Sequence, residues 1–246
     1  MKLRWKILLG ILLAIGFACG YWMYDKQDRM HRVTPEALAA LESDGQVTVT
    51  QDEWIVFEPA TNTPTKGLIF YPGGECDERG YAEPLREIAS AGYLVVLVPM
   101  PLQLAVLAPD KATDVIAAYP DIDSWAIAGH SLGGSMAARY AFQHPDNLAG
   151  LIMWDAYAPD DMTDRTLAIR MVHRANQAGD PPADYEPYLP LLPPQTDFYP
   201  LKGGIHLNFG NFIAGRLYRD EPTPALDPTT QRELAAAATI EFMNKL

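Results

Sequence analysis

The stretch AIAGHSLGGSMAARYAF, residues 126–142, places a serine between glycines where an apolar run changes into a helical pattern. Gly129, Ser131 and Gly133 match G-x-S-x-G, the nucleophile elbow, in which a sharp turn joins a buried strand to a helix. Glycines flank the serine because side chains there would collide with the adjoining strand and helix. Such a turn lifts the hydroxyl out of the sheet, so we predict that Ser131 is a nucleophile.

Short apolar runs alternate with helical patterns on both sides of this stretch. A run without polar alternation is typical of a strand buried on both faces, and alternating strands and helices favour a mostly parallel sheet. We predict an α/β fold, a central, mostly parallel sheet with helices on both faces, with its site at the carboxyl ends of the strands. The expected strands are residues 46–51 and 53–60 as an antiparallel pair, then the runs at 67–74, 93–101, 124–130, 148–159, 166–174 and 196–204. A final helix follows from residue 227, with Thr230 and Glu233 spaced as a capping box.

The first part of the chain has a different character from the rest. Residues 7–24, ILLGILLAIGFACGYWMY, carry no charge over a length close to that of a membrane span, and aromatic residues end the segment. No clear small-x-small cleavage site follows, so we expect an uncleaved anchor rather than a removed signal. A lipoprotein-type site at Cys19 is a poor match, because Gly16 stands where an aliphatic residue is usual.

The domain boundaries follow from these patterns. We expect residues 1–24 to be a membrane anchor, residues 25–45 a polar neck with a short helix, and residues 46–246 the globular domain. Basic residues lie on both sides of the anchor, and we expect the globular domain on the extracytoplasmic side. Cys19 and Cys76 are not expected to form a disulfide, because one lies in the apolar segment and the other in a later loop.

A serine nucleophile needs a base, and the chain has five histidines. His206 lies in the glycine-rich loop KGGIHLNFG directly after the last expected strand, where an imidazole can reach back to a central strand. We predict His206 as the base, with His173, at the end of an earlier strand, as the alternative. His31 in the neck, His130 at the variable position of the elbow and His144 at a helix end have structural explanations.

The base in turn needs a carboxylate, and two aspartates stand between the serine and His206 in suitable places. Asp155 ends the strand that follows the serine's own strand, and its neighbours Trp154 and Ala156 would leave it partly desolvated. Asp180 follows the next strand, where the acid more commonly lies, but its Gly-Asp-Pro-Pro context is also ordinary turn chemistry. We favour Asp155 and keep Asp180 as the alternative acid.

An oxyanion hole is expected from two backbone amides. Leu132, directly after the nucleophile, supplies the first. The stretch YPGGE, residues 71–75, follows the first buried strand, and its paired glycines allow close approach of the backbone. One of Gly73, Gly74 and Glu75 would supply the second amide.

These residues resemble the α/β-hydrolase superfamily and, within it, the dienelactone-hydrolase-like bacterial group. The resemblance runs from about Lys66 to Leu246 and is carried by IFYPGG, GHSLGG and GGIHLNFG, which are similar to that group's oxyanion loop, elbow and histidine loop. It implies Ser131 as nucleophile, His206 as base, and oxyanion donors near Gly74 and Leu132. The chain departs from the group at the acid, because Asn176 stands where an aspartate is common. Some members of the superfamily place the acid one strand earlier, which agrees with Asp155.

The function that follows is a membrane-anchored serine hydrolase of a small-molecule acyl substrate: a carboxylic ester, thioester or lactone. The alternative is a catalytically degenerate domain of the same fold that binds a partner or acts as a scaffold. The net charge of −12 argues against nucleic acid as a partner, and no motif points to a metal or a cofactor. We expect residues 177–200, with Tyr157, Tyr185, Tyr188, Met100 and Pro101, to shape the substrate pocket.

Overall fold

The computed structural model describes residues 2–216 and 221–246. Eight strands form one sheet in the order β2-β3-β5-β4-β6-β7-β8-β9. β3 pairs antiparallel with both β2 and β5, and the other pairings in this sheet are parallel. The predicted fold class is therefore confirmed. The strands are β2 (Val47–Gln51), β3 (Ile55–Pro59), β4 (Lys66–Tyr71), β5 (Leu94–Leu97), β6 (Ser124–His130), β7 (Gly150–Trp154), β8 (Ala168–Ala175) and β9 (Asp197–Lys202).

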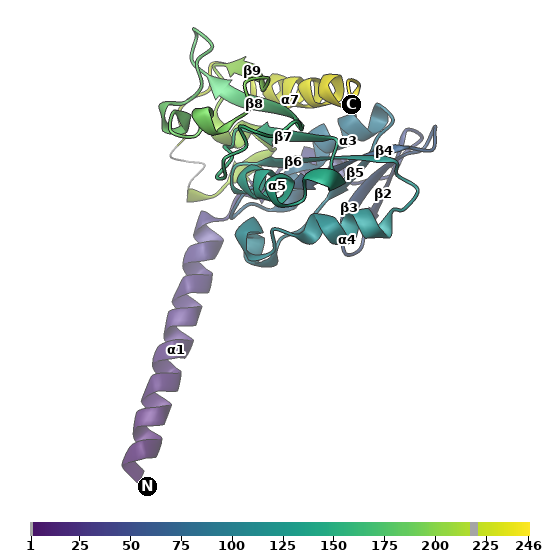
Figure 1. Cartoon of the computed structure of the whole chain (residues 1–246). Helices are drawn as coiled ribbons and strands as arrows, with labels where there is room; N and C mark the ends of the chain where they lie inside the picture. The colour runs from purple at the N-terminus through teal and green to yellow at the C-terminus, as the bar shows by residue number, and fades with distance from the viewer. Residues whose placement is uncertain (1, 217–220) are drawn as a thin grey trace.

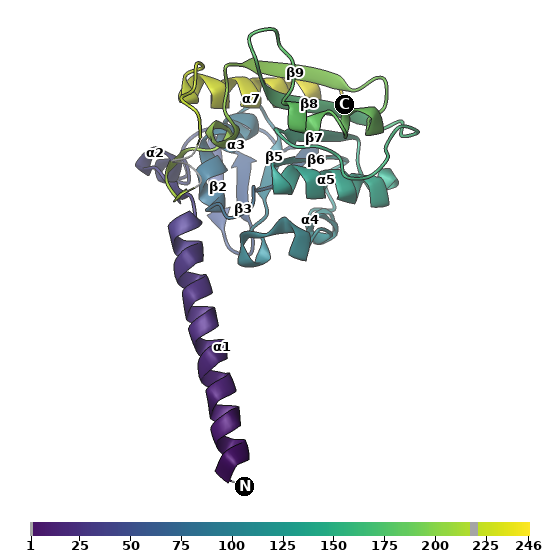
Figure 2. The same cartoon turned by 90° about the vertical axis from the view of Figure 1, so that its left-hand side faces the viewer.

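Helices cover both faces of this sheet (Figures 1 and 2). α3 (Ala82–Ser90) and α7 (Pro228–Met243) pack on one face, and α4 (Lys111–Ala118) and α5 (Leu132–Gln143) pack on the other. Short 3-10 helices lie in the connections: η1 (Glu78–Tyr81), η2 (Pro101–Gln103), η3 (Ala105–Leu107), η4 (Pro145–Asn147), η5 (Ala183–Tyr185), η6 (Leu189–Leu191) and η7 (His206–Phe209).

The apolar runs of the sequence become strands that are buried on both faces. In β4, Leu68 and Phe70 belong to the core under α3 and α7, whereas Ile69 and Tyr71 belong to the core under α4 and α5. Side chains alternate between the two faces of a strand, so a continuous apolar run fills both cores.

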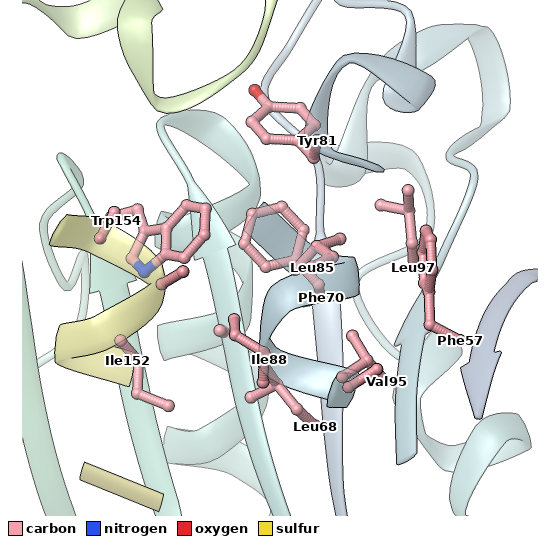
Figure 3. Packing of buried hydrophobic residues seen from close by; sticks show 14 of the residues in the cluster. Phe57, Leu68, Phe70, Tyr81, Leu85, Ile88, Val95, Leu97, Ile152 and Trp154 are labelled. Atoms are coloured by element: carbon pink, nitrogen blue, oxygen red, sulfur yellow. The ribbon is translucent and has the colours of Figure 1, made fainter. Parts of the chain in front are cut away.

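The first of these cores also fixes the end of β7, next to the site (Figure 3). The Trp154 ring lies 4.9 Å from the Phe70 ring, centroid to centroid, with the ring planes at 64°. The Trp154 indole N–H donates to Thr239 Oγ1 on α7 at 3.0 Å, so the buried indole keeps a hydrogen-bond partner. Trp154 thus holds the strand end that carries Asp155.

The start of α7 differs from the predicted capping box. Asp227 is the N-cap, and its side chain accepts from the Thr230 amide at 2.9 Å. Pro228 follows at the first helical position, where a fixed φ suits the helix. The prediction of Thr230 as the cap was therefore wrong, because an aspartate directly before a proline is the better start.

An N-terminal helix, α1 (Lys2–Arg29), projects from the domain (Figures 1 and 2). Its segment Arg4–Gln27 is 24 residues long, and the most apolar 18 residues in it have a mean hydropathy of 1.9, so by length and composition it could cross a membrane. The helix runs five residues beyond Tyr24, into the expected neck, and α2 (Pro35–Ala39) follows it.

The chain after α1 is tied into the domain. β1 (Arg32–Val33) pairs antiparallel with β10 (Phe212–Ala214). The His31 amide donates to Glu75 O, and the Asp77 amide donates to His31 O, both at 3.2 Å. The root of α1 therefore lies beside the loop that follows β4.

Candidate functional site

Ser131 occupies the turn between β6 and α5 in a backbone conformation that residues other than glycine rarely adopt. Its φ is 52° and its ψ is −125°. The Ser131 amide donates to Trp154 O at 3.1 Å, and the Ser135 amide donates to Ser131 O at 3.0 Å, so both sides of the turn are fixed. The surrounding structure holds a strained serine at the end of a central strand, which is a common property of functional sites.

The glycines of the motif are required by close approach. A Cβ on Gly133 would lie 2.2 Å from the carbonyl oxygens of Tyr71 and Pro72, and one on Gly129 would lie 2.6 Å from the Gly133 carbonyl carbon. These neighbours are backbone atoms and cannot turn aside as a side chain can. Helix α5 can therefore start against β4 and β6 only without these side chains.

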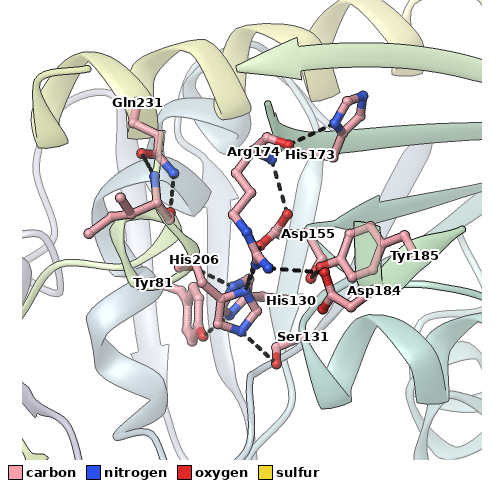
Figure 4. A network of polar contacts seen from close by, with 11 residues as sticks. Tyr81, His130, Ser131, Asp155, His173, Arg174, Asp184, Tyr185, His206 and Gln231 are labelled. Carbon is pink, nitrogen blue, oxygen red and sulfur yellow. Dashed lines mark hydrogen bonds and ion pairs between the residues drawn. The ribbon is translucent and has the colours of Figure 1, made fainter. Parts of the chain in front are cut away.

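The structure brings Ser131, His206 and Asp155 together in a chain of hydrogen bonds (Figure 4). The distance from His206 Nε2 to Ser131 Oγ is 2.9 Å, and the distance from His206 Nδ1 to Asp155 Oδ2 is 2.5 Å. An ionised carboxylate only accepts, so Nδ1 carries the hydrogen and Nε2 is left to accept from the serine hydroxyl. The imidazole therefore has the tautomer that a general base needs.

Asp155 is buried and held from several sides. It has a φ of 44° and is 1% exposed. The Arg174 amide donates to Asp155 Oδ1 at 3.0 Å, and the Arg174 guanidinium donates to Oδ2. Burial alone would raise the pKa of Asp155, but the hydrogen bond from His206 and the charges of His206 and Arg174 outweigh it and lower the pKa to about 2. The carboxylate stays ionised near neutral pH.

Arg174 is a part of this site that the sequence analysis missed. Its Nη1 lies 3.1 Å from His206 Nδ1, and its Nη2 lies 3.6 Å from Asp184 Oδ1. Because β7 and β8 are parallel neighbours, the residues just beyond Trp154 and Val172 lie side by side. The sequence analysis predicted no spatial order of the strands, but consecutive strands of such a sheet are commonly neighbours, and this tendency would have pointed to Arg174.

His130 forms a second buried connection within the site. Its Nε2 lies 3.0 Å from His206 O, and its Nδ1 lies 2.7 Å from Tyr81 Oη, which also accepts from the Gly73 amide at 3.2 Å. Burial and the nearby His206 hold the pKa of His130 well below its usual value. A neutral imidazole donating through Nε2 and accepting at Nδ1 satisfies both partners. His130 and Tyr81 thus link the loop that carries His206 to residues 71–75, which we call the glycine loop. The motif alone does not indicate this role.

Of the three amides expected in the glycine loop, two are already used. The Gly73 amide donates to Tyr81, and the Glu75 amide donates to Gln103 O at 3.0 Å. Within the described residues the Gly74 amide has no such partner. A Cβ on Gly74 would lie 3.1 Å from Leu132 Cδ2, so Gly74 and Leu132 adjoin. Leu132 is the first residue of α5, where an amide has no intrahelical acceptor.

The other predicted residues lie apart from this cluster. Asp180 is exposed, and its Oδ2 accepts from Asn176 Nδ2 at 3.0 Å within a local turn. His173 is buried, with its Nδ1 2.9 Å from Arg174 O. The structure therefore places neither the alternative acid nor the alternative base against Ser131.

A cavity of about 880 Å³ opens above Ser131. Tyr157 and Tyr185 line it as expected, and Tyr188 stacks on Tyr157 with ring centroids 3.8 Å apart. Met100 and Pro101 are not among its lining residues. Apolar side chains make up much of the wall, among them Leu132, Met136, Pro159, Ile205 and Leu207.

His31 also lines this cavity, although the sequence analysis placed it in the neck. It is 1% exposed, and neither ring nitrogen has a hydrogen-bond partner within the described residues. Burial, and next the charge of His206, lower the pKa of His31 to about 4. Nothing in the neck sequence indicated this position, because it depends on the pairing of His31 with the loop after β4.

Comparisons with known proteins agree with this fold. A model of the Alpha/beta hydrolase family matches residues 67–222. A protein from Thermoplasma acidophilum described as a predicted CIB-like hydrolase has a TM-score of 0.58 at 15% identity, with 81% of this chain and 100% of that chain covered. A ferulic acid esterase from Streptomyces cinnamoneus has a TM-score of 0.56 at 14% identity, covering 76% of this chain and 68% of that chain. A structure from work on the metagenome-derived lipolytic enzymes LipS and LipT has a TM-score of 0.54 at 14% identity, covering 74% of this chain and 95% of that chain.

No curated protein sequence gives a significant match. The matching family and structures support the superfamily that the sequence resembles. Membership of the narrower dienelactone-hydrolase-like group stays a prediction.

Proposed function

Because the chain belongs to the alpha/beta hydrolase family, we propose that it is a serine hydrolase acting on an acyl substrate through Ser131, His206 and Asp155. One observation carries this proposal: the hydrogen bonds run without a break from a strained serine through an imidazole to a buried carboxylate. This arrangement activates a serine for acyl transfer.

The reaction follows from the geometry of these groups. Ser131 Oγ attacks the acyl carbon while His206 Nε2 takes the hydroxyl proton, and Asp155 stabilises the imidazolium that forms. The amides of Gly74 and Leu132 donate to the developing oxyanion. His206 then protonates the leaving group, and a water molecule activated by the same nitrogen cleaves the acyl-enzyme. Carboxylic esters, thioesters and lactones all suit this chemistry.

The proposal includes a membrane anchor. A helix of 24 residues spans about 36 Å at 1.5 Å per residue, enough for a hydrocarbon core of about 30 Å. None of this apolar segment is buried, so its apolar side chains do not pack against the domain. We place the catalytic domain on the extracytoplasmic side. An intact mass that includes Met1 tests whether the anchor stays uncleaved. Protease digestion of vesicles of known sidedness tests on which side of the membrane the domain lies.

A fluorophosphonate tests the nucleophile without knowledge of the substrate. In the full-length chain we expect one adduct, on Ser131, found by peptide mass spectrometry. Ser131→Ala should remove the adduct and all turnover while leaving the melting temperature unchanged within a few degrees. Ser135→Ala is the matched control, because Ser135 also lines the cavity yet has no hydrogen bond to His206. No adduct on folded wild-type protein would favour the non-catalytic, binding alternative.

A further inference from the structure

Three exposed apolar side chains lie together on the segment between β5 and α4. Leu102, Val106 and Leu107 are 54%, 50% and 53% exposed, and we call them the anchor-side patch. Outside α1, the exposed large apolar side chains within the described residues are few: Leu38, Leu102, Val106, Leu107, Phe198 and Ile213. Half of that set therefore falls on one six-residue segment.

The anchor-side patch lies at the root of α1. Lys26 Nζ donates to Leu102 O at 2.7 Å, and Gln103 Nε2 lies 3.1 Å from Met30 Sδ. Figures 1 and 2 both show the segment before α4 on the side of the domain from which α1 projects. Ile213, on β10, lies beside the same root, because β10 pairs with β1.

The depth of the patch follows from the helix. Trp22 and Tyr24 are exposed near the end of the apolar segment, where aromatic side chains mark a membrane interface. Lys26 is four residues beyond Trp22, which corresponds to about 6 Å along the helix axis. Since Lys26 Nζ donates to Leu102 O, the start of this segment lies near the level of the lipid head groups when α1 spans a bilayer.

The backbone of this segment has an unusual conformation. Leu102 has a φ of 52° and Gln103 has a φ of 58°, so two successive residues that are not glycine take the left-handed conformation. A leucine rarely adopts this conformation, and strained residues of this kind cluster at functional sites. Exposure of these apolar side chains to water is unfavourable, whereas contact with lipid would stabilise them.

The same segment is bonded to the proposed active site. The Glu75 amide donates to Gln103 O at 3.0 Å, and a Cβ on Gly74 would lie 3.9 Å from Leu104 Cδ2. The glycine loop beside Ser131 is thus the next layer behind the patch. The cavity beyond it has a largely apolar wall.

We propose that the anchor-side patch rests in the lipid interface and that the substrate is an amphiphilic acyl ester taken from the same bilayer. This inference rests on the proposed serine hydrolase and names its substrate class. Ser131 Oγ forms a bond to the ester carbonyl carbon, the bond from that carbon to the alkoxy oxygen breaks, and the serine proton passes through His206 to the alcohol. Water then releases the fatty acid and restores the serine.

The position of the patch is measured first, independently of catalysis. Val106→Cys is made in a full-length chain carrying Cys19→Ala, labelled with a nitrobenzoxadiazole dye and inserted in phosphatidylcholine vesicles. Cys76 is buried and stays unlabelled. Nitroxide lipids with the spin label near the head group should quench the dye at residue 106. Phe198→Cys, an exposed site on β9 far from α1, is the control and should not be quenched. An unquenched dye at residue 106 would overturn the proposed surface.

The substrate class is tested with two esters. The double variant Val106→Asp/Leu107→Asp should hydrolyse a fluorogenic long-chain ester in the vesicles at least tenfold more slowly than wild type. Its turnover of a water-soluble short-chain ester should stay within twofold. Phe198→Asp should change neither rate.

The outcomes separate the two proposals. If wild type cleaves the soluble ester but not the vesicle-bound one, or if the double variant matches wild type in vesicles, the lipid substrate is refuted and the hydrolase stands. If wild type cleaves neither ester, the lipid substrate is refuted. The hydrolase proposal fails as well if the fluorophosphonate also leaves Ser131 unlabelled, and dye quenching still decides whether the patch lies in the interface.

Discussion

Replacing Asp155 with asparagine keeps the shape of the side chain and removes its charge. If the asparagine oxygen keeps the bond from the Arg174 amide, its NH₂ group faces His206 Nδ1 and the Arg174 guanidinium, which both donate in the wild type. His206 must then accept at Nδ1 and carry its hydrogen on Nε2, so it cannot take the proton of Ser131. If the asparagine side chain is flipped, its NH₂ group faces the backbone N–H of Arg174, so two donors oppose each other at a site that is fully buried in the wild type.

The expected loss can be worked from this tautomer. Removing a correctly placed acid from a Ser-His-Asp site lowers kcat by about 10⁴-fold, and at 1.36 kcal/mol for each factor of ten this is about 5 kcal/mol. The rate of fluorophosphonate labelling at Ser131 measures the activation directly. Asp180→Asn is the matched control, because it makes the same chemical change at an exposed turn. Its rate should stay within twofold of wild type.

We expect Asp155→Asn to fold, because Arg174 keeps Asp184 as a partner. Circular dichroism and urea unfolding check this expectation. A folded Asp155→Asn variant that reacts within tenfold of wild type would refute the assignment of the acid. A loss that is larger in Asp180→Asn than in Asp155→Asn would move the acid to the later position.

Three further outcomes are expected. Gly133→Ala should prevent correct folding or abolish labelling, because its Cβ meets carbonyl oxygens at 2.2 Å, whereas Gly45→Ala, with nothing within 4 Å, should behave as wild type in thermal melting. The pKa of Asp155 is lowered to about 2 from an unfolded value near 3.8, so its contribution of about 2 kcal/mol is complete above pH 4 and is lost as the pH falls towards 2. Urea unfolding between pH 5 and pH 2 should show that loss in wild type, and a smaller one in Asp155→Asn. Tyr81→Phe should lower the free energy of unfolding by about 2 kcal/mol in urea, because it leaves His130 Nδ1 and a buried amide unpaired.

The sheet could be predicted from the sequence because its strands are fully buried. Apolar runs such as residues 67–71 and 148–154 have no polar alternation, and the structure puts them in the centre of the sheet. β1 and β10 could not be predicted, because strands of two and three residues show no periodicity. The cap of α7 was missed although Asp227 precedes a proline, since the capping-box spacing was given more weight.

The grouping of the site residues followed partly from the chain and partly from tertiary contacts. Asp155 was favoured because a carboxylate between Trp154 and Ala156 is hard to explain without a partner, and the structure puts it against His206. Arg174 was within reach of the same reasoning through the adjacency of β7 and β8. His31 was beyond it, since that residue is far from the other site residues in sequence and reaches the cavity only through its backbone pairing.

The contribution of His31 to the cavity makes the N-terminal helix more than an exchangeable tether. A chain trimmed to begin at Arg32 would lose the imidazole from the cavity wall, and with it the backbone bonds to Glu75 and Asp77 that support the glycine loop. The N-terminal helix and the hydrolase-fold domain thus share a junction instead of meeting at a linker. A soluble version intended to report native specificity should therefore keep residues 30–33, and a graft of a different anchor should be made before Met30.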